Sequence, residues 1–481
     1  MELKTAMFPW QEKAVEKLIK LRVGALYMEM GTGKTRAALE MIKRRLDVGK
    51  IDRVLWLCPC SIIESIRTDI NKHSTGAEDV IQIYGIESLS GSKKLYGILY
   101  KYVSGGRAML VVDESNLVKN SRAIRTQKIT SIAEACPYRI ILNGTPISRN
   151  EADLFAQWYI LDWRILGYQS YYSFAANHLE YDDKYKHRVR RVLNVRYLTD
   201  KISPYTYMVK KSEAVQLPKK TYDVEHFHMD YAQFVHYEEE MSAFLSTLVS
   251  EDDSAAIYRT FTALQEIASG RRIVSDASEP IMHVPFYDDP HLNPRIQALK
   301  RVLGQFEDEK VVIWCKFQHE IDDISYILRE KYGDDAVCIF CGTLTPKERN
   351  RSLKLFMDNA RFFVANKTCA GYGLNLQFCH VAVYYNNDWD LATRAQSEDR
   401  IHRIGQAETV RIVDIAGYES IDSRILRCLS RKENMVESFK GMLKSKNRAQ
   451  WLSGRDVDVS DTPGADKGPE TGGNQELHPG A

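Results

Sequence analysis

The stretch that decides the fold is GALYMEMGTGKTRAALEMIKRRL, residues 24–46. It begins with a short apolar run, passes through two glycines and ends in a segment with apolar residues at helical spacing. A strand, a glycine-rich turn and a helix in this order bring backbone N–H groups and a helix N-terminus to one point, where they can bind phosphate. The stretch therefore predicts a nucleotide site within an α/β fold.

Each residue type in this turn has a predicted role. Gly31 and Gly33 let the backbone approach a phosphate, Lys34 would reach the β- and γ-phosphates of ATP, and the Thr35 hydroxyl would bind Mg²⁺. Met28 occupies the position at which the strict phosphate-loop pattern has its first glycine. The predicted nucleotide-binding loop comprises Met30, Gly31, Thr32, Gly33, Lys34 and Thr35.

An acidic pair follows a second apolar run, AMLVVDES at 108–115. An aspartate at the end of a buried strand can hold Mg²⁺, and the next glutamate can polarise an attacking water. Taken alone, such a pair is usually a solvated turn. Because it follows a phosphate loop, we predict that Asp113 binds the metal and that Glu114 activates water.

Short apolar runs alternate with amphipathic segments along most of the chain, which predicts two parallel β-sheets of the βαβ kind. The runs begin near residues 53, 108, 138, 310, 336, 361, 381 and 410. Between about 147 and 290 helical patterns dominate, interrupted by prolines. We expect a nucleotide-binding lobe at 1–150, a helical protrusion and linker at 151–215, a helical insertion at 216–290, a second lobe at 291–450 and a disordered tail at 451–481.

Composition is that of a globular protein: 481 residues, 44% hydrophobic and 27% charged. Residues 453–481 hold two basic residues and six acids, a net charge of −4, which leaves +6 on the rest of a chain whose total is +2. This modest positive balance permits nucleic-acid binding. Without an apolar run of membrane-spanning length or a signal peptide, the sequence favours a cytoplasmic protein, in a bacterial cell or a phage-infected host.

Nine cysteines, an odd number, lie mostly in apolar runs and are expected to be reduced core residues. Cys338 and Cys341 form one CxxC pair. Since no second pair follows at metal spacing, we expect it to pack in the core and predict no zinc site.

A very polar stretch, QSEDRIHRIGQ at 396–406, follows the apolar run VAVYYNN. Arg400 and Arg403 stand at helical spacing, so they could simply share the solvated face of a surface helix. The phosphate loop far upstream favours another interpretation, in which the arginines reach the bound nucleotide.

The order of motifs carries a family resemblance. FPWQ, MEMGTGKT, LCPCSIIES, VVDESNLVKN, LNGTPI, VVIWCKF, CAGYGLNL and QSEDRIHRIGQ follow one another between about residues 5 and 430. This order resembles the superfamily 2 helicase-like ATPases, in the DEAD/DEAH-box style, and within them the Swi/Snf-type DNA translocases. The resemblance implies two RecA-like lobes with parallel sheets and helical insertions, and ATP hydrolysis in the cleft between the lobes.

The resemblance also implies roles for single residues. Arg400 and Arg403 match the arginines that stabilise charge on the γ-phosphate, and Gln396 matches the glutamine that opens their motif. Gln11 resembles the glutamine that senses adenine, because an amide can both donate to and accept from a purine edge. Elements that couple hydrolysis to lobe movement are matched by Asn116, Gly144, Thr145, Gly371, Gly373 and Asn375.

Three positions depart from the family pattern. Asn116 stands where histidine is usual, Tyr372 where glycine is common, and Ile66 where tryptophan is usual. Asparagine can form hydrogen bonds but cannot become charged, so we expect altered coupling with hydrolysis retained.

Candidate nucleic-acid contacts come partly from the family and partly from charge. KYKHRVRRVLNVR at 184–196 carries six Lys or Arg residues in what we interpret as a helical insertion, although such a run is often only a solvated face. Trp389 matches a tryptophan near DNA, though core packing is an equally simple explanation. The candidates are Ser61, Lys316, Thr368, Trp389, Arg190 and Arg191.

The sequence thus predicts an ATP- and Mg²⁺-dependent motor on double-stranded DNA, monomeric, without sequence reading and with any targeting left to protein partners. A strand-separating DNA or RNA helicase of the same superfamily is the nearest alternative. A DNA-binding switch or scaffold with negligible turnover is the alternative from another class, which the intact loop, acids and arginines disfavour.

Overall fold

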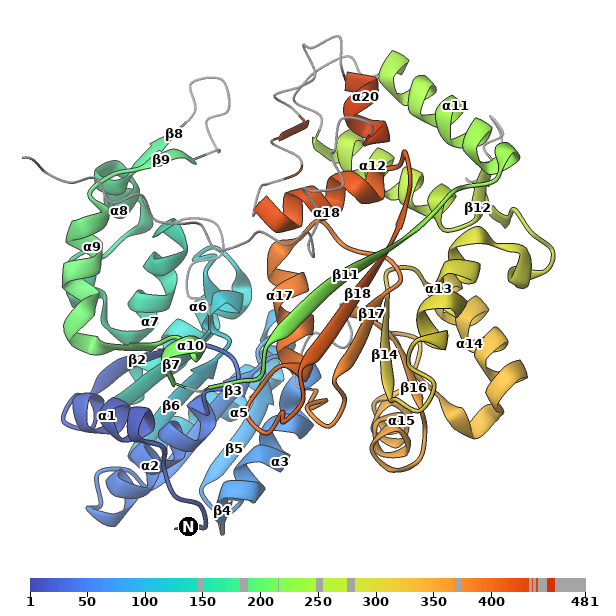
Figure 1. Cartoon of the computed structure of the whole chain (residues 1–481). Helices are drawn as coiled ribbons and strands as arrows, with labels where there is room; N and C mark the ends of the chain where they lie inside the picture. The colour runs from blue at the N-terminus through green and yellow to red at the C-terminus, as the bar shows by residue number, and fades with distance from the viewer. Residues whose placement is uncertain are drawn as a thin grey trace, which may run out of the picture. The chain divides into compact units, whose positions relative to one another are not determined.

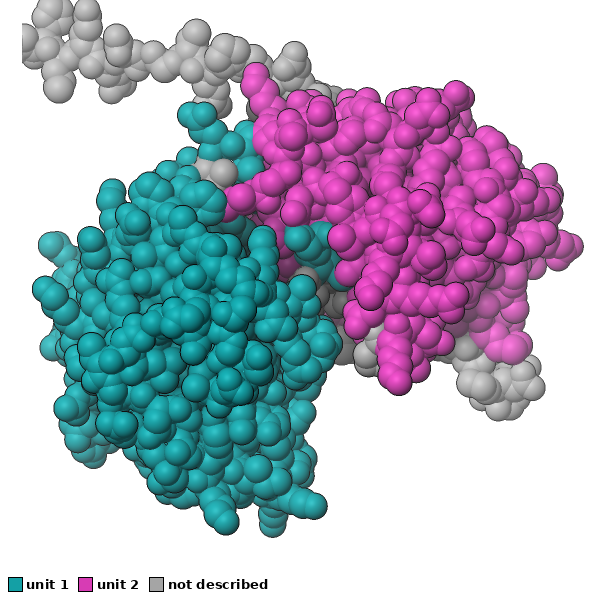
Figure 2. Space-filling model, turned by 90° about the horizontal axis from the view of Figure 1, so that it is seen from below, with its two compact units in different colours: residues 1–217, 372–375 teal, residues 218–371, 376–481 magenta. Residues whose placement is uncertain are grey.

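The structure is a computed structural model that describes residues 1–144, 151–181, 189–214, 216–247, 254–274, 282–367, 374–431, 435, 438–439 and 448–454. The chain divides into two compact units, shown in teal and magenta in Figure 2. Unit 1 comprises Met1–Leu217 and Tyr372–Asn375, and unit 2 comprises Pro218–Gly371 and Leu376–Ala481. Each contains one six-stranded sheet with all neighbouring strands parallel.

The sheet of unit 1 has the order β10, β2, β7, β6, β3, β5. These strands are β10 (Thr206–Val209), β2 (Val23–Met28), β7 (Tyr138–Asn143), β6 (Ala108–Asp113), β3 (Arg53–Cys58) and β5 (Ile81–Gly85). Alternate residues of β3 supply two separate cores: Trp56 enters one and Leu55 enters the other. Both faces are therefore covered, which explains why this strand reads as an unbroken apolar run.

Helices cover both faces of this sheet (Figure 1). They are α1 (Pro9–Leu18), α2 (Lys34–Asp47), α3 (Ile63–His73), α5 (Lys93–Ser104), α6 (Ile124–Glu134), α7 (Leu154–Leu166), α8 (Tyr171–His178) and α9 (Val195–Ile202). Residues of α1 and α2 belong to the core that contains Trp56, and residues of α5, α6 and α7 belong to the core that contains Leu55.

The sheet of unit 2 has the order β11, β18, β17, β14, β16, β15. These strands are β11 (Lys220–Phe227), β18 (Val410–Gly417), β17 (Val381–Tyr384), β14 (Val311–Cys315), β16 (Phe362–Asn366) and β15 (Val337–Phe340). Its helices are α11 (Tyr231–Thr247), α12 (Ser254–Ala268), α13 (Pro294–Gly304), α14 (Gln318–Tyr332), α15 (Pro346–Asp358), α17 (Leu391–Ile401), α18 (Ile421–Arg431) and α20 (Arg448–Ser453).

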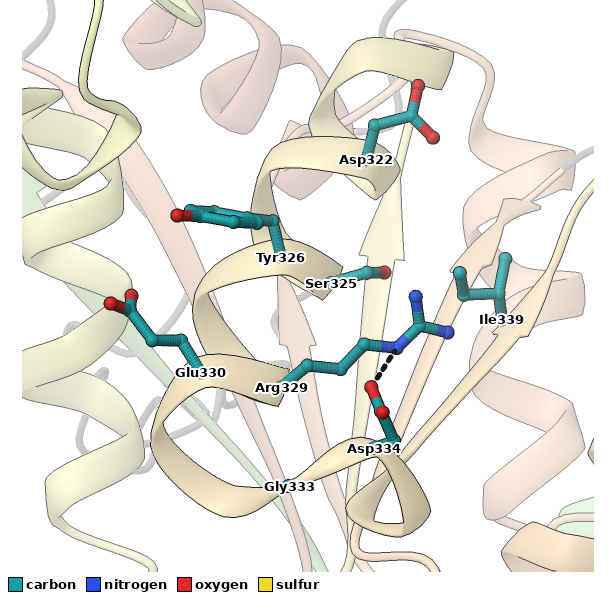
Figure 3. Close-up of a pocket in the computed structure, with 8 residues that line it drawn as sticks. All are labelled: Asp322, Ser325, Tyr326, Arg329, Glu330, Gly333, Asp334 and Ile339. Atoms are coloured by element: carbon teal, nitrogen blue, oxygen red, sulfur yellow. Dashed lines mark ion pairs between the residues drawn. The ribbon is translucent and has the colours of Figure 1, made fainter.

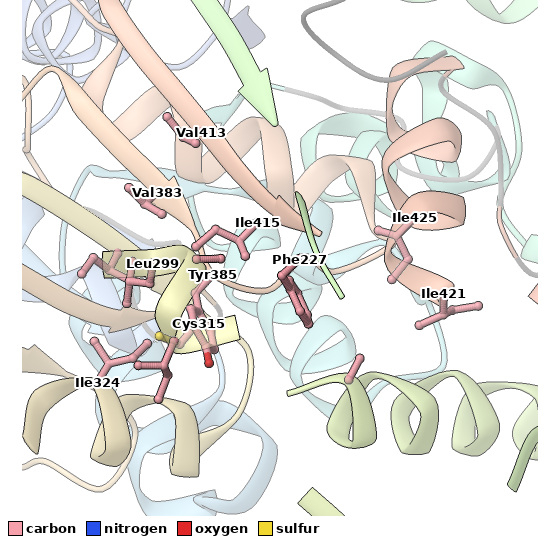
Figure 4. Packing of buried hydrophobic residues seen from close by; sticks show 14 of the residues in the cluster. Phe227, Leu299, Cys315, Ile324, Val383, Tyr385, Val413, Ile415, Ile421 and Ile425 are labelled. Atoms are coloured by element: carbon pink, nitrogen blue, oxygen red, sulfur yellow. The ribbon is translucent and has the colours of Figure 1, made fainter. Parts of the chain in front are cut away.

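The main core of unit 2 lies on one face of this sheet. Leu299 of α13, Ile324 of α14 and Ile425 of α18 pack there with residues of the strands, as Figure 4 shows. Trp314 and Tyr384 do not belong to this core and pack together with ring centroids 6.4 Å apart. Both are buried, so the sheet is covered on two sides here as well.

The two predicted parallel sheets are confirmed, and every apolar run named from the sequence forms a strand. The helical character expected at 216–290 was wrong for Lys220–Phe227, which is the edge strand β11 beside β18 (Figure 1). Its sequence KTYDVEHF alternates polar and less polar residues, as expected for an edge strand with one exposed side. The same region holds an antiparallel pair, β12 (Arg271–Val274) with β13 (Met282–Pro285).

The basic segment of unit 1 also differs from its predicted form. Val189–Val192 is strand β9, paired antiparallel with β8 (Leu179–Tyr181), and not a helix. Valines at both ends of VRRV favour an extended chain. Residues 182–188 of the basic run and the acidic tail from 455 onward lie outside the described residues.

Eight cysteines of the described chain are free thiols, and all but Cys60 are buried, including Cys338 and Cys341. Among the helices that the structure describes, none has the length and apolar character needed to cross a membrane.

Candidate nucleotide site and nucleic-acid contacts

The predicted phosphate loop forms the turn between β2 and α2. Gly31 has φ 82° and Gly33, the residue that caps α2, has φ 83°. Both lie in the left-handed region, which glycine enters without steric cost. Because α2 begins at Lys34, its free N–H groups and the positive end of its dipole point at the space above the turn. This is the geometry that a phosphate-binding turn requires.

Two side chains at the start of α1 brace this loop. Gln11, only 2% exposed, donates through Nε2 to the carbonyl oxygens of Thr32 at 3.1 Å and Gly33 at 3.3 Å. Its Oε1 accepts from the backbone N–H of Phe8 at 2.9 Å. The Trp10 Nε1 donates to the same Thr32 carbonyl at 2.9 Å. Both amide protons of Gln11 are thus used by the loop, so its predicted contact with adenine would need the amide to exchange partners.

Gly33→Ala is expected to damage this brace. A Cβ at Gly33 would lie 2.1 Å from the Gln11 Nε2, and the positive φ would strain any L-residue. We expect nucleotide affinity, measured with a fluorescent ATP analogue, to fall at least about tenfold, the cost of roughly 1.4 kcal/mol that such backbone strain carries. Gly97→Ala is the matched control, because open space surrounds Gly97. Unchanged affinity in Gly33→Ala would contradict this loop geometry.

Lys34 and Met28 are joined across the turn. The Lys34 Nζ donates to the Met28 carbonyl oxygen at 3.2 Å, and Met28 ends strand β2 with its side chain fully buried. Met28, which stands in place of the first glycine of the pattern, therefore packs its side chain in the core of unit 1. Its backbone carbonyl still forms a hydrogen bond with Lys34 across the turn.

The acid pair lies at the end of β6, and the end of β7 lies between it and the loop. Asp113 is 4% and Glu114 8% exposed, and Glu114 has φ 49°, an uncommon conformation for a non-glycine residue. Burial, with a smaller contribution from the Glu114 charge, raises the pKa of Asp113 to about 7, while Lys34 opposes the shift. A Cβ added to Gly144, after β7, would lie 3.4 Å from the Met30 nitrogen and 3.6 Å from the Lys34 Nζ.

The side chains present fit Mg²⁺ held together with a nucleotide. Mg²⁺ usually binds one or two protein oxygens, substrate phosphates and water, whereas a dedicated protein cage is rare. Asp113 and Thr35 are buried in unit 1, and no cluster of three or more His, Cys, Asp or Glu side chains within the described ranges could hold a metal by itself. A buried carboxyl that binds a metal is expected to have a raised pKa while no cation is present, because nothing then offsets the cost of burying its negative charge.

A buried polar chain continues from the acid pair toward α7. The Ser115 hydroxyl donates to the Gln157 Oε1 at 2.6 Å, and the Asn143 Nδ2 donates to the Ser115 Oγ at 3.3 Å. Asn116 lies in the turn η2 (Ser115–Val118), and its Oδ1 is buried with no hydrogen-bond partner in the described part of the chain. Of the other predicted coupling residues, Asn375 is exposed, whereas Thr145, Gly371 and Gly373 lie outside the described residues.

The predicted arginines of unit 2 lie at the end of α17. Arg400 is 6% exposed, and its carbonyl oxygen accepts from the Leu376 N–H at 3.0 Å. Arg403 follows the helix and is partly exposed, as is Gln396. Arg400 is buried at the end of α17, so the solvated-surface alternative does not describe it.

Two charged residues that the sequence did not single out fix α17 to the sheet. The Arg394 guanidinium donates to both oxygens of Asp414, at 2.5 and 3.1 Å, and lies 3.5 Å above the Tyr384 ring. Asp414 is fully buried in strand β18. An aspartate inside the apolar run VRIVDIA is a signal that could have predicted a buried cationic partner.

The candidate nucleic-acid residues have different environments. Ser61, in the short helix η1 (Cys60–Ile62), is exposed, as are Arg190 and Arg191 on β9, although Arg190 lies 3.6 Å from the Glu180 carboxylate. Thr368 lies outside the described residues. Exposed hydroxyl and guanidinium groups are suited to phosphate contacts.

Lys316, by contrast, is held by protein groups. Its ammonium lies 3.7 Å above the Trp389 ring and 3.5 Å from Asp388, and it donates to Gln265 of α12. Burial lowers the pKa of Lys316, an effect that Asp388 opposes. Trp389 itself packs on Phe261 with ring centroids 5.7 Å apart. The Lys316 ammonium is therefore placed to orient Trp389.

A separate cavity of about 640 Å³ is lined by residues of α14, by the turn that follows it and by Ile339 of β15 (Figure 3). Arg329 in its wall lies 3.7 Å from Asp334. None of the residues predicted to bind nucleotide or nucleic acid lines it.

Comparisons with known proteins show which families the chain resembles. A profile of the SNF2-related domain matches residues 70–279, and a profile of the helicase conserved C-terminal domain matches residues 294–405. An uncharacterized ATP-dependent helicase of Mycoplasma genitalium is 24% identical over 433 residues, which cover 86% of this chain and 40% of that protein. The ATP-dependent helicase brm of Drosophila melanogaster is 25% identical, with 92% and 30% covered, and the ISWI chromatin-remodeling complex ATPase of Saccharomyces cerevisiae is 23% identical, with 88% and 40% covered.

The chain spans less than half the length of these curated relatives. Among solved structures, the SWI2/SNF2 ATPase core of Sulfolobus solfataricus in complex with dsDNA is 19% identical, with 96% of this chain and 97% of that chain covered and a TM-score of 0.38.

Proposed function

The chain belongs to the SNF2-related family of helicase-like ATPases, and from this membership we propose that it is an ATP-driven motor that moves along double-stranded DNA. One observation carries the proposal. A single chain combines a braced phosphate loop beside a buried acid pair with a second parallel-sheet unit, in which the end of α17 carries the buried Arg400 and the residues that follow it carry the partly exposed Arg403. A passive nucleotide-binding module needs only the first of these.

Unit 1 would bind the nucleotide. Backbone N–H groups of the turn and the Lys34 ammonium would bind the phosphates of ATP. Thr35 and Asp113 would hold Mg²⁺, which when bound neutralises phosphate charge. Glu114 would orient a water molecule for attack on the γ-phosphorus and accept its proton, while the bond to the β-phosphate oxygen breaks and ADP and phosphate form.

Unit 2 would complete the reaction. Arg400 and Arg403 would place positive charge against the γ-phosphate oxygens, where negative charge develops as the bond breaks. Binding of ATP would then favour the arrangement in which both units share the nucleotide, and product release would end that arrangement. Alternation between the two would move the motor along DNA.

The DNA contacts would be made to phosphates. Ser61, Arg190 and Arg191 are exposed polar groups suited to the backbone of a duplex, and Trp389, oriented by Lys316, would lie beside it. Thr368 belongs to the same proposed set. Such contacts carry no sequence information, so targeting would depend on protein partners, and the motor would act as a monomer in the cytoplasm.

The polynucleotide specificity of wild-type ATP hydrolysis tests this proposal. We expect duplex DNA to stimulate phosphate release more than single strands or RNA do, and the apparent duplex affinity to fall at least about tenfold between roughly 50 and 200 mM salt. We also expect displacement of a third strand from a triplex without separation of a plain duplex. Equal rates with and without every polynucleotide would contradict the motor, and duplex separation would favour the helicase alternative.

A further inference from the structure

The chain passes between its two units at three places, 217/218, 371/372 and 375/376, of which the second lies outside the described residues. At the other two crossings, a residue of unit 2 forms a hydrogen bond with the segment that ends α17. The Pro218 carbonyl oxygen lies 2.8 Å from the His402 Nε2, which must be the protonated ring nitrogen, because a carbonyl only accepts. The Leu376 N–H donates to the Arg400 carbonyl oxygen at 3.0 Å. The segment that carries the arginines is therefore attached to the crossings at Pro218 and Leu376.

Glu398 strengthens the first of these attachments. Its side chain is 9% exposed and accepts from the Lys220 Nζ at 2.7 Å and the Tyr222 hydroxyl at 2.9 Å, both on β11. It also accepts from the Arg394 Nε at 2.8 Å. Strand β11 begins two residues after Pro218, so Glu398 binds α17 to the first element that the chain builds on entering unit 2.

The charges favour this arrangement. Burial would raise the pKa of Glu398, but Arg394 and Lys220 outweigh burial and hold the pKa below its ordinary value. A buried carboxylate that accepts three hydrogen bonds is costly to leave unpaired, so a loss of these donors would shift the helix. Glu398 and His402 are four residues apart, and the His402 N–H donates to the Glu398 carbonyl at 2.9 Å, so both side chains lie on one face of the same turn.

We propose that Glu398 and His402 are positioning residues that hold Arg400 and Arg403 in a fixed place relative to the chain crossings at Pro218 and Leu376, so that movement of unit 2 about these crossings carries the arginines with it. This inference rests on the proposed function, because it assigns a purpose to the placement of residues that act on ATP. Neither residue would touch the nucleotide. Both would act through the position of the helix end.

A double-mutant cycle tests the inference. Glu398→Gln is expected to lower kcat with saturating ATP and duplex DNA about 10- to 100-fold, the cost of misplacing a catalytic group by a fraction of an ångström to 1 Å. Affinity for a fluorescent ATP analogue should stay within about twofold, since unit 1 is unchanged. In an Arg400→Ala background the same substitution should lower kcat by a clearly smaller factor, because one of the two arginines through which Glu398 acts is already gone. The exposed Glu408→Gln is the matched control.

His402 offers a conservative rescue. His402→Gln keeps an N–H donor that can reach the Pro218 carbonyl and should retain most of kcat, whereas His402→Ala should lower it as Glu398→Gln does. A merely structural role would instead lower kcat by the same factor in the wild-type and Arg400→Ala backgrounds. That result, or an unchanged kcat in Glu398→Gln, would overturn the inference.

Hydrogen exchange separates this inference from the proposed function. Glu398→Gln should speed amide exchange at residues 398–406 and leave α1 and α2 unaffected, whether or not the wild type hydrolyses ATP. A wild type that is inactive with every polynucleotide would defeat the proposed motor alone. Exchange at 398–406 that stays at the wild-type rate in Glu398→Gln would defeat the anchoring alone.

Discussion

Replacement of Lys34 by alanine is expected to lower duplex-stimulated ATP hydrolysis about 100- to 1,000-fold or more, the usual cost of removing a group that stabilises charge in a transition state. Lys34 is the first residue of α2, and its Nζ donates to the Met28 carbonyl oxygen at 3.2 Å. Alanine would remove this hydrogen bond and the positive charge that favours the ionised form of Asp113. Lys34 does not belong to either apolar core of unit 1, so the unit should remain folded. Phosphate release, measured under saturating ATP and duplex DNA, gives the effect.

Lys43→Ala is the matched control for this substitution. Lys43 lies on the same helix, and its ammonium pairs with the Asp47 carboxylate at 2.6 Å, away from the glycine turn. Ion pairs at such exposed positions contribute little to stability, because water screens them. We expect Lys43→Ala to hydrolyse ATP at nearly the wild-type rate. Equal ATPase activity of Lys34→Ala and Lys43→Ala would contradict a role of the glycine turn in ATP hydrolysis.

Replacement of Arg400 by alanine is expected to lower kcat by about 1,000-fold or more while nucleotide affinity changes little, as for other arginines that stabilise a transferred phosphoryl group. The reason for this split is that the loop, the acid pair and the Gln11 brace all belong to unit 1, whereas Arg400 belongs to unit 2. Single-turnover hydrolysis and binding of a fluorescent ATP analogue measure the two quantities separately.

Because Arg400 is buried, its loss could also weaken unit 2, so two further variants accompany it. Arg400→Lys keeps the charge without the planar guanidinium and should recover only part of the rate. Arg301→Ala removes an exposed guanidinium of α13 that pairs with Glu225 of strand β11, and this variant should leave the rate unchanged. If Arg400→Ala weakened ATP binding as much as it slowed hydrolysis, the arginine would serve binding and not turnover.

The features predictable from sequence were those with a pattern of their own. Strands β3 and β6 are buried on both faces, so their apolar runs were unambiguous. The glycine turn was equally clear, because residue types and spacing follow from the needs of a phosphate. Strand β11 was missed because an edge strand alternates polar and apolar residues, and tyrosine, valine and histidine at every second position gave a weak signal.

Other features could not be predicted because they depend on partners far apart in the chain. The sequence gives Gln11 a place in a motif, but its bonds to Thr32 and Gly33 follow from how α1 packs on the loop. Lys316 was expected to contact nucleic acid, and in the structure its ammonium donates a hydrogen bond to Gln265 of α12 and lies above the Trp389 ring. A charged residue in a motif indicates that its side chain has a specific partner, but only the packing of the folded chain shows which partner it contacts.

We expect the arginine segment of unit 2 to reach a triphosphate held by the glycine turn of unit 1. An ATP analogue with a photoreactive group on its γ-phosphate tests it most directly, with cross-linked peptides identified by mass spectrometry in the presence of duplex DNA. Cross-links are expected to residues 396–406 as well as to the loop at 28–35, and both should be lost in Lys34→Ala. Cross-links confined to peptides of unit 1, with none at 396–406 under any condition that supports hydrolysis, would contradict it.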